Sequence, residues 1–443
     1  MTVLTYTLGV LLFAFGLMAS VALHEAGHLI PGKLFNVKVT QFFVGFGRTL
    51  WSRQRGETEY GVKAIPLGGY CKLVGMVPPN EDEVEAGDPT LVRSRNTGMF
   101  AQLVSDAKTA EYEHVDPHDH DRLFYNKPWW QRVVIMGSGV AINIVLAFFL
   151  FAIAFMGIGT DTKATTTVEA VSQCVVAVTR TNIDQAPRAC RSTDPEAPAK
   201  KAGLLPGDRI VSFNGKKMTT WAQVQTAIRG NGDQKAVLVV ERKGDRLTLN
   251  ADTVVSTVPD LGDRQKITEA GFLGVVPTTV NEKQSLGFVV STMANGSWQT
   301  VVTIAHLPQK LYHVARAALG LEKRDINGPM SIVGAGRVAG EVASAPEVSF
   351  GDRAFQLITL LAGLNLFLGL INLVPLPPFD GGGIATTLYE AVRRGIARLR
   401  GKPDPGGVDS AKLLPVTYVM ASLILVMSVI LIYADIVAPI SLS

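Results

Sequence analysis

The feature of this 443-residue sequence that most constrains its fold is a set of four uncharged stretches. They cover residues 3–23, 133–160, 354–379 and 413–434. About 20 consecutive apolar residues are enough for an α-helix to cross the hydrocarbon core of a bilayer. The sequence therefore predicts a polytopic α-helical membrane protein with four transmembrane helices, in segments 1–32, 128–160, 354–383 and 413–435.

The composition supports a membrane protein. Hydrophobic residues make up 47% of the chain and charged residues only 18%, which is too apolar for an average soluble enzyme. The first apolar run is too long for a cleaved signal peptide, and it lacks a basic N-terminal region and an Ala-x-Ala cleavage site. We expect it to remain in the mature protein.

The distribution of lysine and arginine predicts the orientation. Thirteen lie in residues 33–132 and six in 381–412, whereas none lies before the first apolar run or after Lys412. Because cytoplasmic loops are enriched in Lys and Arg, both basic segments are expected to be cytoplasmic and both termini extracytoplasmic. This bias accounts for the net charge of +4, so no nucleic-acid partner is expected.

At the end of the first run lies the motif His24-Glu25-Ala26-Gly27-His28. Two histidines at i and i+4 share one face of a helix and can bind one Zn²⁺, while the glutamate beside the first can act as a general base on water. His24 is expected roughly 33 Å along the helix from the N-terminus, inside the membrane towards its cytoplasmic boundary. Ionisable groups at such a depth usually mark function, although side chains reaching to the interface are the alternative.

A catalytic zinc site has three protein ligands and an open position for water, so a third ligand is expected near another span. The sequence NLVPLPPFDGG, residues 372–382, ends the third uncharged run at Asp380. Its prolines cannot continue a helix, and Gly381 to Gly383 permit a tight turn beside a ligand. Asp380 alone is equally compatible with a cap of the helix that follows.

His-Glu-x-x-His in a first span together with Asn-x-x-Pro-x-Pro-x-x-Asp-Gly in a later one resembles the site-2 protease family of intramembrane zinc metalloproteases. The resemblance implies that His24, His28 and Asp380 are ligands of one Zn²⁺ and that Glu25 is the catalytic base. It also implies that Asn372 holds the substrate backbone.

Residues 37–76 are rich in β-branched and aromatic residues with glycine turns, within a predicted β-hairpin region 33–79. They resemble the membrane-associated β-hairpin sheet of the family. In that sheet a glycine-flanked element, here Gly45-Phe46-Gly47, leaves an edge that an unwound substrate joins by β-augmentation. The alternative is a cytoplasmic hairpin with glycines at bulges.

The outside segment carries AGLLPGDRIVSFNG, residues 202–215, which resembles bacterial PDZ domains. With strands expected around 235–241 and 246–250, we place one extracytoplasmic PDZ domain at 165–277. Cys174 and Cys190 lie in a compartment that permits oxidation, so we predict a disulfide between them, with two unpaired thiols as the alternative. Cys71, on the cytoplasmic side, should stay reduced.

Three further segments connect these parts. Their predicted forms are an extracytoplasmic amphipathic segment at 281–350, a basic cytoplasmic segment at 384–412 and a flexible, polar cytoplasmic insertion at 80–127. The insertion contains His114, His118 and His120 among aspartates, which make a weak second metal site because a loop does not fix their geometry. Trp129 and Trp130 then anchor the second span at the interface.

The resemblance implies a bacterial inner-membrane enzyme of the PDZ-containing type that acts in regulated intramembrane proteolysis and sigma-factor signalling. Its partners would be the lipid bilayer and single-span membrane proteins, such as anti-sigma factors already trimmed outside, or remnant signal peptides. The alternative is a non-catalytic PDZ-bearing membrane scaffold with a vestigial metal motif. A metal transporter fits less well, because four spans with a single ligand set make a poor permeation path.

Overall fold

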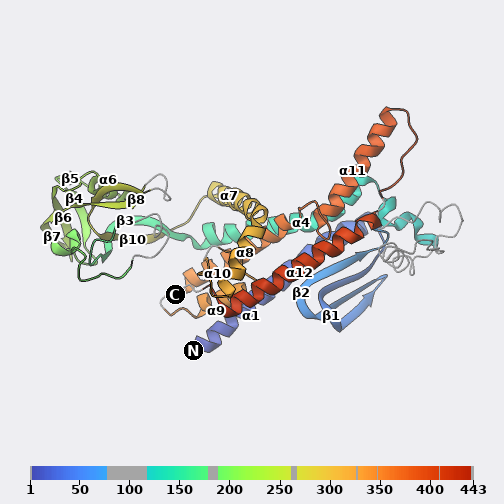
Figure 1. The fold of residues 1–443 in the computed structure, drawn as a ribbon, viewed down its shortest axis with the longest axis horizontal. Helices are drawn as coiled ribbons and strands as arrows, with labels where there is room; N and C mark the ends of the chain where they lie inside the picture. Colours follow the sequence, from blue (N-terminus) through green and yellow to red (C-terminus); the bar gives the residue numbers. More distant parts are fainter. Residues whose placement is uncertain are drawn as a thin grey trace. The chain divides into compact units, whose positions relative to one another are not determined.

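The computed structural model describes residues 2–76, 117–177, 188–260, 267–325, 328–346, 348–408 and 410–440. The chain forms two compact units. One combines Met1–Ile158 with Ser285–Ser443, and the other is Gly159–Gln284. The first unit contains the long apolar helices, and the second is a β-rich domain (Figure 1).

Four helices of the described chain are long and apolar enough to cross a membrane. They are α1 (Thr2–Leu34), α4 (Trp129–Ala152, continued by the π-helical η3, Ile153–Ile158), α10 (Phe350–Ile371) and α12 (Leu414–Val437). Each corresponds to one of the four predicted runs. The expectation of a multi-pass helical membrane protein is confirmed at this level.

Local sequence explains where the spans begin and end. The side chain of Ser349 caps α10 by accepting a hydrogen bond of 3.2 Å from the backbone N–H of Asp352. Pro415 lies in the first turn of α12, where its missing N–H is tolerated. α10 stops at Ile371, four residues before the first proline of the motif, so the membrane helix ends before Asp380 is reached.

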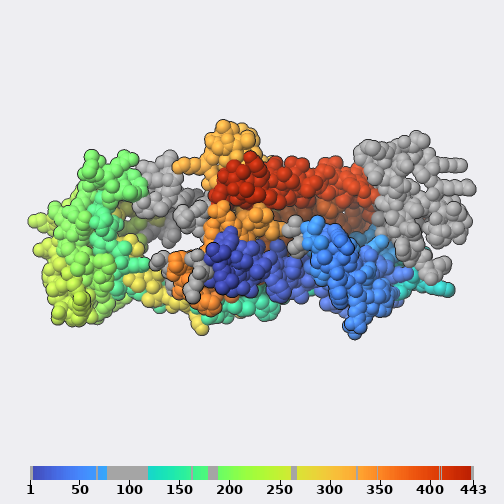
Figure 2. All heavy atoms as spheres, turned by 90° about the horizontal axis from the view of Figure 1, so that it is seen from below, coloured from blue at the N-terminus to red at the C-terminus, as the bar shows by residue number. Residues whose placement is uncertain are grey.

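The predicted amphipathic segment 281–350 folds into three helices: α7 (Leu286–Ala305), α8 (Leu307–Ala318) and α9 (Ile332–Ser344). α7 packs against α4 and α10, with Val289 buried against Ala362 and Leu366. α9 contacts both α1 and α12. Figure 2 shows α1 in blue and α12 in red as two long ridges on one face, with orange chain between them.

Between the first two spans lie two long strands, β1 (Val39–Arg55) and β2 (Thr58–Leu73). Both strands bend, so they pair more than once. The 39–44 part of β1 pairs antiparallel with 69–73 on one side and runs in the same direction as 59–62 on the other, and residues 49–55 pair antiparallel with 58–63. The strongly β-forming sequence predicted here thus forms a sheet whose 69–73 stretch pairs on one side only within the described chain.

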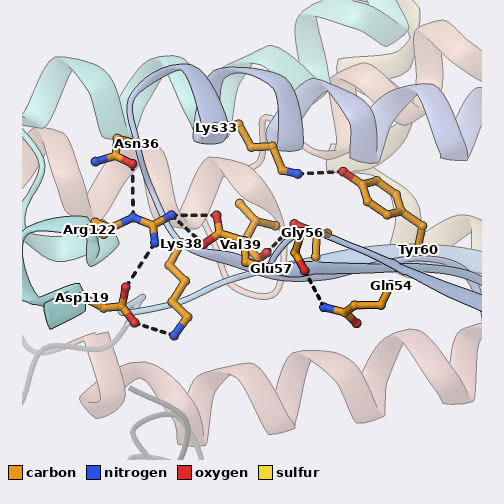
Figure 3. A network of polar contacts seen from close by, with 11 residues as sticks. Lys33, Asn36, Lys38, Val39, Gln54, Gly56, Glu57, Tyr60, Asp119 and Arg122 are labelled. Carbon is orange, nitrogen blue, oxygen red and sulfur yellow. Dashed lines mark hydrogen bonds and ion pairs between the residues drawn. The ribbon is translucent and has the colours of Figure 1, made fainter. Parts of the chain in front are cut away.

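The predicted flexible insertion 80–127 lies partly outside the described residues, but its end is ordered. It forms two short 3₁₀ helices, η1 (Pro117–Arg122) and η2 (Phe124–Asn126). Charged side chains fasten it to the sheet (Figure 3). Arg122 forms two hydrogen bonds of 2.7 Å with Glu57 and one of 3.2 Å with Asp119. Asp119 also pairs with Lys38 at 2.5 Å. These ion pairs lower the pKa of the Asp119 carboxyl, chiefly through Lys38.

After the third span, the chain forms α11 (Asp380–Leu399), a loop and the short η4 (Ser410–Leu413) before α12. α11 packs on the first part of α4. Arg132 of α4 and Glu390 of α11 are both buried and form a two-pronged ion pair with distances of 2.7 and 3.2 Å. Burial alone would raise the pKa of Glu390, but Arg132 outweighs it and the pKa is lowered.

The β-rich domain has an antiparallel sheet in the order β10-β3-β4-β6-β7, with β5 beside β4. The strands are β3 (Thr160–Val171), β4 (Arg209–Phe213), β5 (Lys216–Lys217), β6 (Lys235–Arg242), β7 (Asp245–Asp252) and β10 (Val275–Glu282). A separate hairpin consists of β8 (Val254–Pro259) and β9 (Ile267–Phe272), and the helices are α5 (Pro198–Lys201) and α6 (Trp221–Arg229). β6 and β7 coincide with the strands expected around 235–241 and 246–250.

This domain has its own core, built from residues such as Val168, Ile210, Val224 and Leu238. Asp208 is fully buried and pairs with Arg242 at 2.7 Å. Cys174 and Cys190 are joined by a disulfide.

Candidate metal centre

The three predicted ligand atoms lie within 3.3 Å of one another. Nε2 of His24 lies 3.3 Å from Nε2 of His28, and Oδ2 of Asp380 lies 3.2 Å from the first nitrogen and 3.3 Å from the second. Ligands bound tetrahedrally to zinc at about 2.0–2.1 Å are separated from each other by about 3.3–3.4 Å. The three atoms therefore occupy the corners that a tetrahedral zinc ion requires. They are the single group of three such residues in the described chain that could hold a metal ion.

The hydrogen bonds behind the ligands favour a cation. Nδ1 of His28 lies 2.8 Å from the carbonyl oxygen of Ile135, which can only accept, so Nδ1 carries a proton and donates it. In the neutral ring, the Nε2 lone pair then points at the other two ligand atoms. Oδ2 of Asp380 is buried and accepts no hydrogen bond from the described residues. Such a cluster of lone pairs is unfavourable unless a cation lies between them.

His24 has a different supporting residue, Asn143 of α4. The side-chain amide of Asn143 lies 3.2 Å from Nδ1 of His24 and is 1% exposed. The amide oxygen has no hydrogen-bond partner among the described residues. When Nε2 binds a metal, Nδ1 carries the ring proton, and Asn143 then satisfies its oxygen by presenting it to that N–H.

Glycines make room for this arrangement where α1 crosses α4. A Cβ added to Gly27 would lie 2.7 Å from Cα of Gly139, and one added to Gly139 would lie 2.5 Å from Nε2 of His28. Ser138 donates a hydrogen bond of 2.6 Å to the carbonyl of Gly27 across the same contact. The close approach of the two helices is what brings Ile135 and Asn143 to the histidines.

Asp380 reaches the site through a tight turn. It is the first residue of α11, and the chain from Asn372 to Phe379 is not helical. The N–H of Gly381 donates a 2.7 Å hydrogen bond to the carbonyl of Asn372, which closes the turn. A Cβ at Gly381 would lie 2.4 Å from the carbonyl oxygens of Leu373 and Val374, so only glycine fits there. Asn372, the predicted substrate-binding residue, thus lies at the base of the turn that carries the ligand.

Glu25 points to another side of α1, towards β2. The backbone N–H of Cys71 faces its carboxylate. A Cβ added to Gly69 would lie 3.1 Å from Cγ of Glu25 and 3.2 Å from Val21. The 69–73 stretch, with its one unpaired side in the described chain, therefore passes directly beside the predicted base. Burial, and next the nearby carboxylate of Glu25, raise the pKa of the Cys71 thiol to about 12, so this thiol is a poor nucleophile.

The predicted element Gly45-Phe46-Gly47 lies at the bend of β1, with both glycines at positive φ. The neighbouring Val44 is paired on both sides, so these residues adjoin the free edge without forming it. The ring of Phe46 stacks on that of Tyr70, at 6.4 Å between centroids. Phe46 therefore reaches across to the 69–73 stretch.

The second candidate metal cluster is not assembled in the described residues. Asp119 is occupied by Lys38 and Arg122, and His120 is exposed and contacts Asn126. His114 lies outside the described residues.

A cavity of about 700 Å³ lies between η2, α4, α11 and the start of α12. Its lining includes Phe379, Gly382 and Gly383, on either side of Asp380, and the ion-paired Arg132 and Glu390. Solvent can therefore approach the segment that carries the third ligand.

Sequence reasoning missed the supporting residues of the site. Asn143 could have been noticed as a polar side chain inside an uncharged run, and Gly139 as a small residue of the kind that lets membrane helices approach closely. Ile135 acts through its backbone carbonyl, for which the sequence carries no signal.

Comparisons with known proteins agree with this geometry. A family model described as Peptidase family M50 matches residues 12–403. The chain is 33% identical to zinc metalloprotease Rip1 of Mycobacterium tuberculosis over 450 residues, which cover 99% of both chains. It is 31% identical to Rip1 of Mycolicibacterium smegmatis over 99% of both chains, and 28% identical to metalloprotease MmpA of Caulobacter vibrioides over 86% of both.

The match includes the His-Glu motif, the Asp380 turn and all of the sheet beside Glu25. Rip1 is named as a zinc metalloprotease, and the donor set of two imidazoles and one carboxylate suits zinc. The chain therefore belongs to peptidase family M50, the site-2 proteases, and is a zinc metalloendopeptidase of the membrane.

Proposed function

We propose that this protease hydrolyses peptide bonds within the transmembrane segments of single-span membrane proteins. The observation that carries the proposal is the convergence of Nε2 of His24, Nε2 of His28 and Oδ2 of Asp380 to within 3.3 Å of one another, with both histidines on α1, an apolar helix of membrane length. The positive-inside bias supports an orientation with this end of α1 towards the cytoplasm and both termini outside. The 700 Å³ cavity beside the Asp380 turn supports the entry of water from this end.

In this proposal His24, His28 and Asp380 hold the zinc ion and Glu25 is the general base. Bound zinc supplies a Lewis acid that polarises the scissile carbonyl and makes water more acidic. The Glu25 carboxylate accepts a proton from the attacking water and then donates it to the leaving amide nitrogen. The contact with the backbone at Cys71 holds the carboxylate on the side of the helix that faces the sheet.

A helical substrate must unwind before its scissile bond is accessible. We infer that the unwound segment pairs with the 69–73 edge of β2, beside which Glu25 lies. Gly45, Phe46 and Gly47 would line the start of this edge, since Phe46 stacks on Tyr70. Asn372, at the base of the Asp380 turn, would bind the substrate backbone from the opposite side.

The β-rich domain is proposed to be a single extracytoplasmic PDZ domain, covering about 165–277. Its Gly-Leu-x-Pro-Gly-Asp segment and the antiparallel order of its strands support this reading. It would exclude untrimmed substrates. The substrates would then be remnant signal peptides and anti-sigma factors whose outer domains have already been removed. The enzyme would act in the inner membrane of a bacterium, in the regulated intramembrane proteolysis that controls sigma-factor signalling.

The test is cleavage of a tagged single-span substrate without its outer domain by the purified full-length protein in detergent. Wild type is compared with Glu25→Gln and with Glu269→Gln, an exposed carboxylate in the β-rich domain that serves as the matched control. Because general acid–base catalysis contributes about 10²–10⁴-fold, Glu25→Gln should lose activity by that factor while keeping one zinc per chain. A zinc chelator should abolish cleavage by wild type and by the control.

Cleavage by Glu25→Gln at the wild-type rate would contradict the assigned role. A non-catalytic scaffold makes a different prediction: it binds the trimmed substrate equally with and without zinc and releases no product.

A further inference from the structure

α11 carries a stripe of exposed apolar side chains that no other described element covers. The exposed fractions are 42% for Leu388, 60% for Val392, 44% for Ile396 and 89% for Leu399, and the neighbouring Tyr389 is 61% exposed. Spacings of four, four and three residues place the first four on one face of the helix. α11 is not among the helices that are apolar enough to span a membrane, so the hydrocarbon core does not account for this exposure.

The opposite face of α11 is packed around the middle of the helix. Thr387 and Glu390 are each 4% exposed, and Glu390 pairs with Arg132 of α4. The loop after the helix folds back over this face, where Arg393 donates hydrogen bonds of 2.7 and 2.9 Å to the carbonyls of Pro405 and Gly406. The apolar stripe is therefore one side of an anchored helix and does not result from fraying.

The contact with α4 fixes the depth of the stripe in the membrane. α4 begins with Trp129 and Trp130, which are about half exposed, as is typical of aromatic anchors at the membrane interface. Arg132 follows within one turn and contacts Glu390, so Leu388 and Val392, which flank Glu390, lie at the same level. α11 is tilted relative to α4 and projects past the ends of α1 and α12 (Figure 1). The middle of the stripe therefore lies at the level of the interface, and the C-terminal part of the helix extends from there.

The charges around the stripe are positive. Arg398 and Arg400 are exposed and form no ion pair within the described chain. At 100° per residue they lie on opposite borders of the stripe. The acidic residue in the middle of the helix, Glu390, is neutralised by Arg132. An amphipathic helix with free arginines beside its apolar face is the pattern that binds anionic lipid surfaces.

We propose that the α11 stripe, made of Leu388, Tyr389, Val392, Ile396 and Leu399, lies in the headgroup region of an anionic phospholipid leaflet. Arg398 and Arg400 bind the lipid phosphates. This lipid-binding surface is a property beyond proteolysis and requires only that the four spans lie in a bilayer. Because α11 begins with Asp380, the same contact anchors the helix that presents the third metal ligand.

The test places a nitroxide label at Val392→Cys in the full chain, with Cys71→Ser removing the free thiol. The protein is reconstituted in nanodiscs of phosphatidylcholine, with or without one part in three of phosphatidylglycerol. Collision rates with oxygen and with a water-soluble nickel chelate report the depth of the label. The matched control is Ala397→Cys, which faces away from the stripe, and both variants must retain one zinc per chain.

We expect the label at 392 to collide mainly with oxygen, more so with the anionic lipid, while the label at 397 collides mainly with the nickel chelate. Replacing Arg398 or Arg400 by glutamine should lower the ratio of docked to undocked helix about fivefold for each charge removed, in anionic discs alone. Equal water access at 392 and 397 in both membranes would overturn the proposal. A second result would also overturn it: a label at 392 that is protected from the nickel chelate in lipid-free detergent and loses this protection when the protein is diluted. That result would show that a second copy of the chain covers the stripe.

Discussion

Replacing Gly139 by alanine should remove zinc binding without unfolding the protein. The added Cβ would lie 2.5 Å from Nε2 and 2.7 Å from Cε1 of His28, and 3.0 Å from Cε1 of His24. Unstrained contacts between such atoms need about 3.5 Å, so about 1 Å must be gained by moving α4 or the His28 ring. The ring is held by its 2.8 Å hydrogen bond to Ile135, and a metal site tolerates ligand displacements of only about 0.2 Å.

We therefore expect the affinity for zinc to fall by at least about 100-fold, the upper end of the effect of disturbing a supporting residue. Gly137→Ala is the matched control, because its Cβ would meet only Ile384, at 3.9 Å. Both changes raise intrinsic helix propensity by about 1 kcal/mol, so neither weakens α4. Zinc per chain and competition with a chromogenic chelator measure the effect, and the unfolding temperature in detergent monitors the fold. The reasoning is refuted if Gly139→Ala binds zinc as tightly as Gly137→Ala.

Three further predictions follow from buried polar contacts. Asn143→Leu should weaken zinc binding about 10–100-fold in the same competition assay, whereas Asn143→Asp, which still accepts from the histidine N–H, should bind zinc nearly as wild type does. Arg132→Met leaves the buried Glu390 carboxylate with only Arg394, at 3.3 Å, and the N–H of Val408 as partners, and should lower the free energy of unfolding by about 3 kcal/mol, the lower end for breaking a buried ion pair; replacing both Arg132 and Glu390 by methionine should restore most of that loss in denaturant unfolding. Burial raises the pKa of Asp208, but Arg242 and a backbone N–H outweigh it, so the folded pKa is below the usual value. The β-rich domain should accordingly lose stability as the pH falls below about 4, and Asp208→Asn should flatten that part of the profile in thermal unfolding between pH 2 and 7.

The parts of the fold that could be predicted from the sequence depend on short-range spacing. Uncharged runs of membrane length gave the four spans, and the four-residue separation of His24 and His28 predicted that their side chains share one helical face. The prolines before Asp380 correctly indicated that the membrane helix ends before this residue. Each of these inferences needs only the local geometry of one segment.

What could not be predicted depends on contacts between distant segments. Asn143 and Ile135 support the histidines only because α1 and α4 cross at Gly27 and Gly139, more than 100 positions apart in the chain. The polar end of the insertion was predicted to be flexible, yet Arg122 anchors it to Glu57, in the turn that joins β1 and β2. Composition does not reveal such partners, because the stabilising charge is contributed by another element.

The His-Glu-x-x-His spacing also separates two tasks around one turn of α1. His24 and His28 face α4, where Gly139 leaves room for them, whereas Glu25, one residue on and about 100° around the helix, faces β2, where Gly69 leaves room for the base. The proposed metal ligands and the proposed base are thus supported by different elements. We expect a shift of the sheet to move the Glu25 side chain together with the 69–73 edge and to leave the histidines, held by α4, in place. In the proposed mechanism, substrate pairing with this edge would therefore adjust the base without loosening the metal.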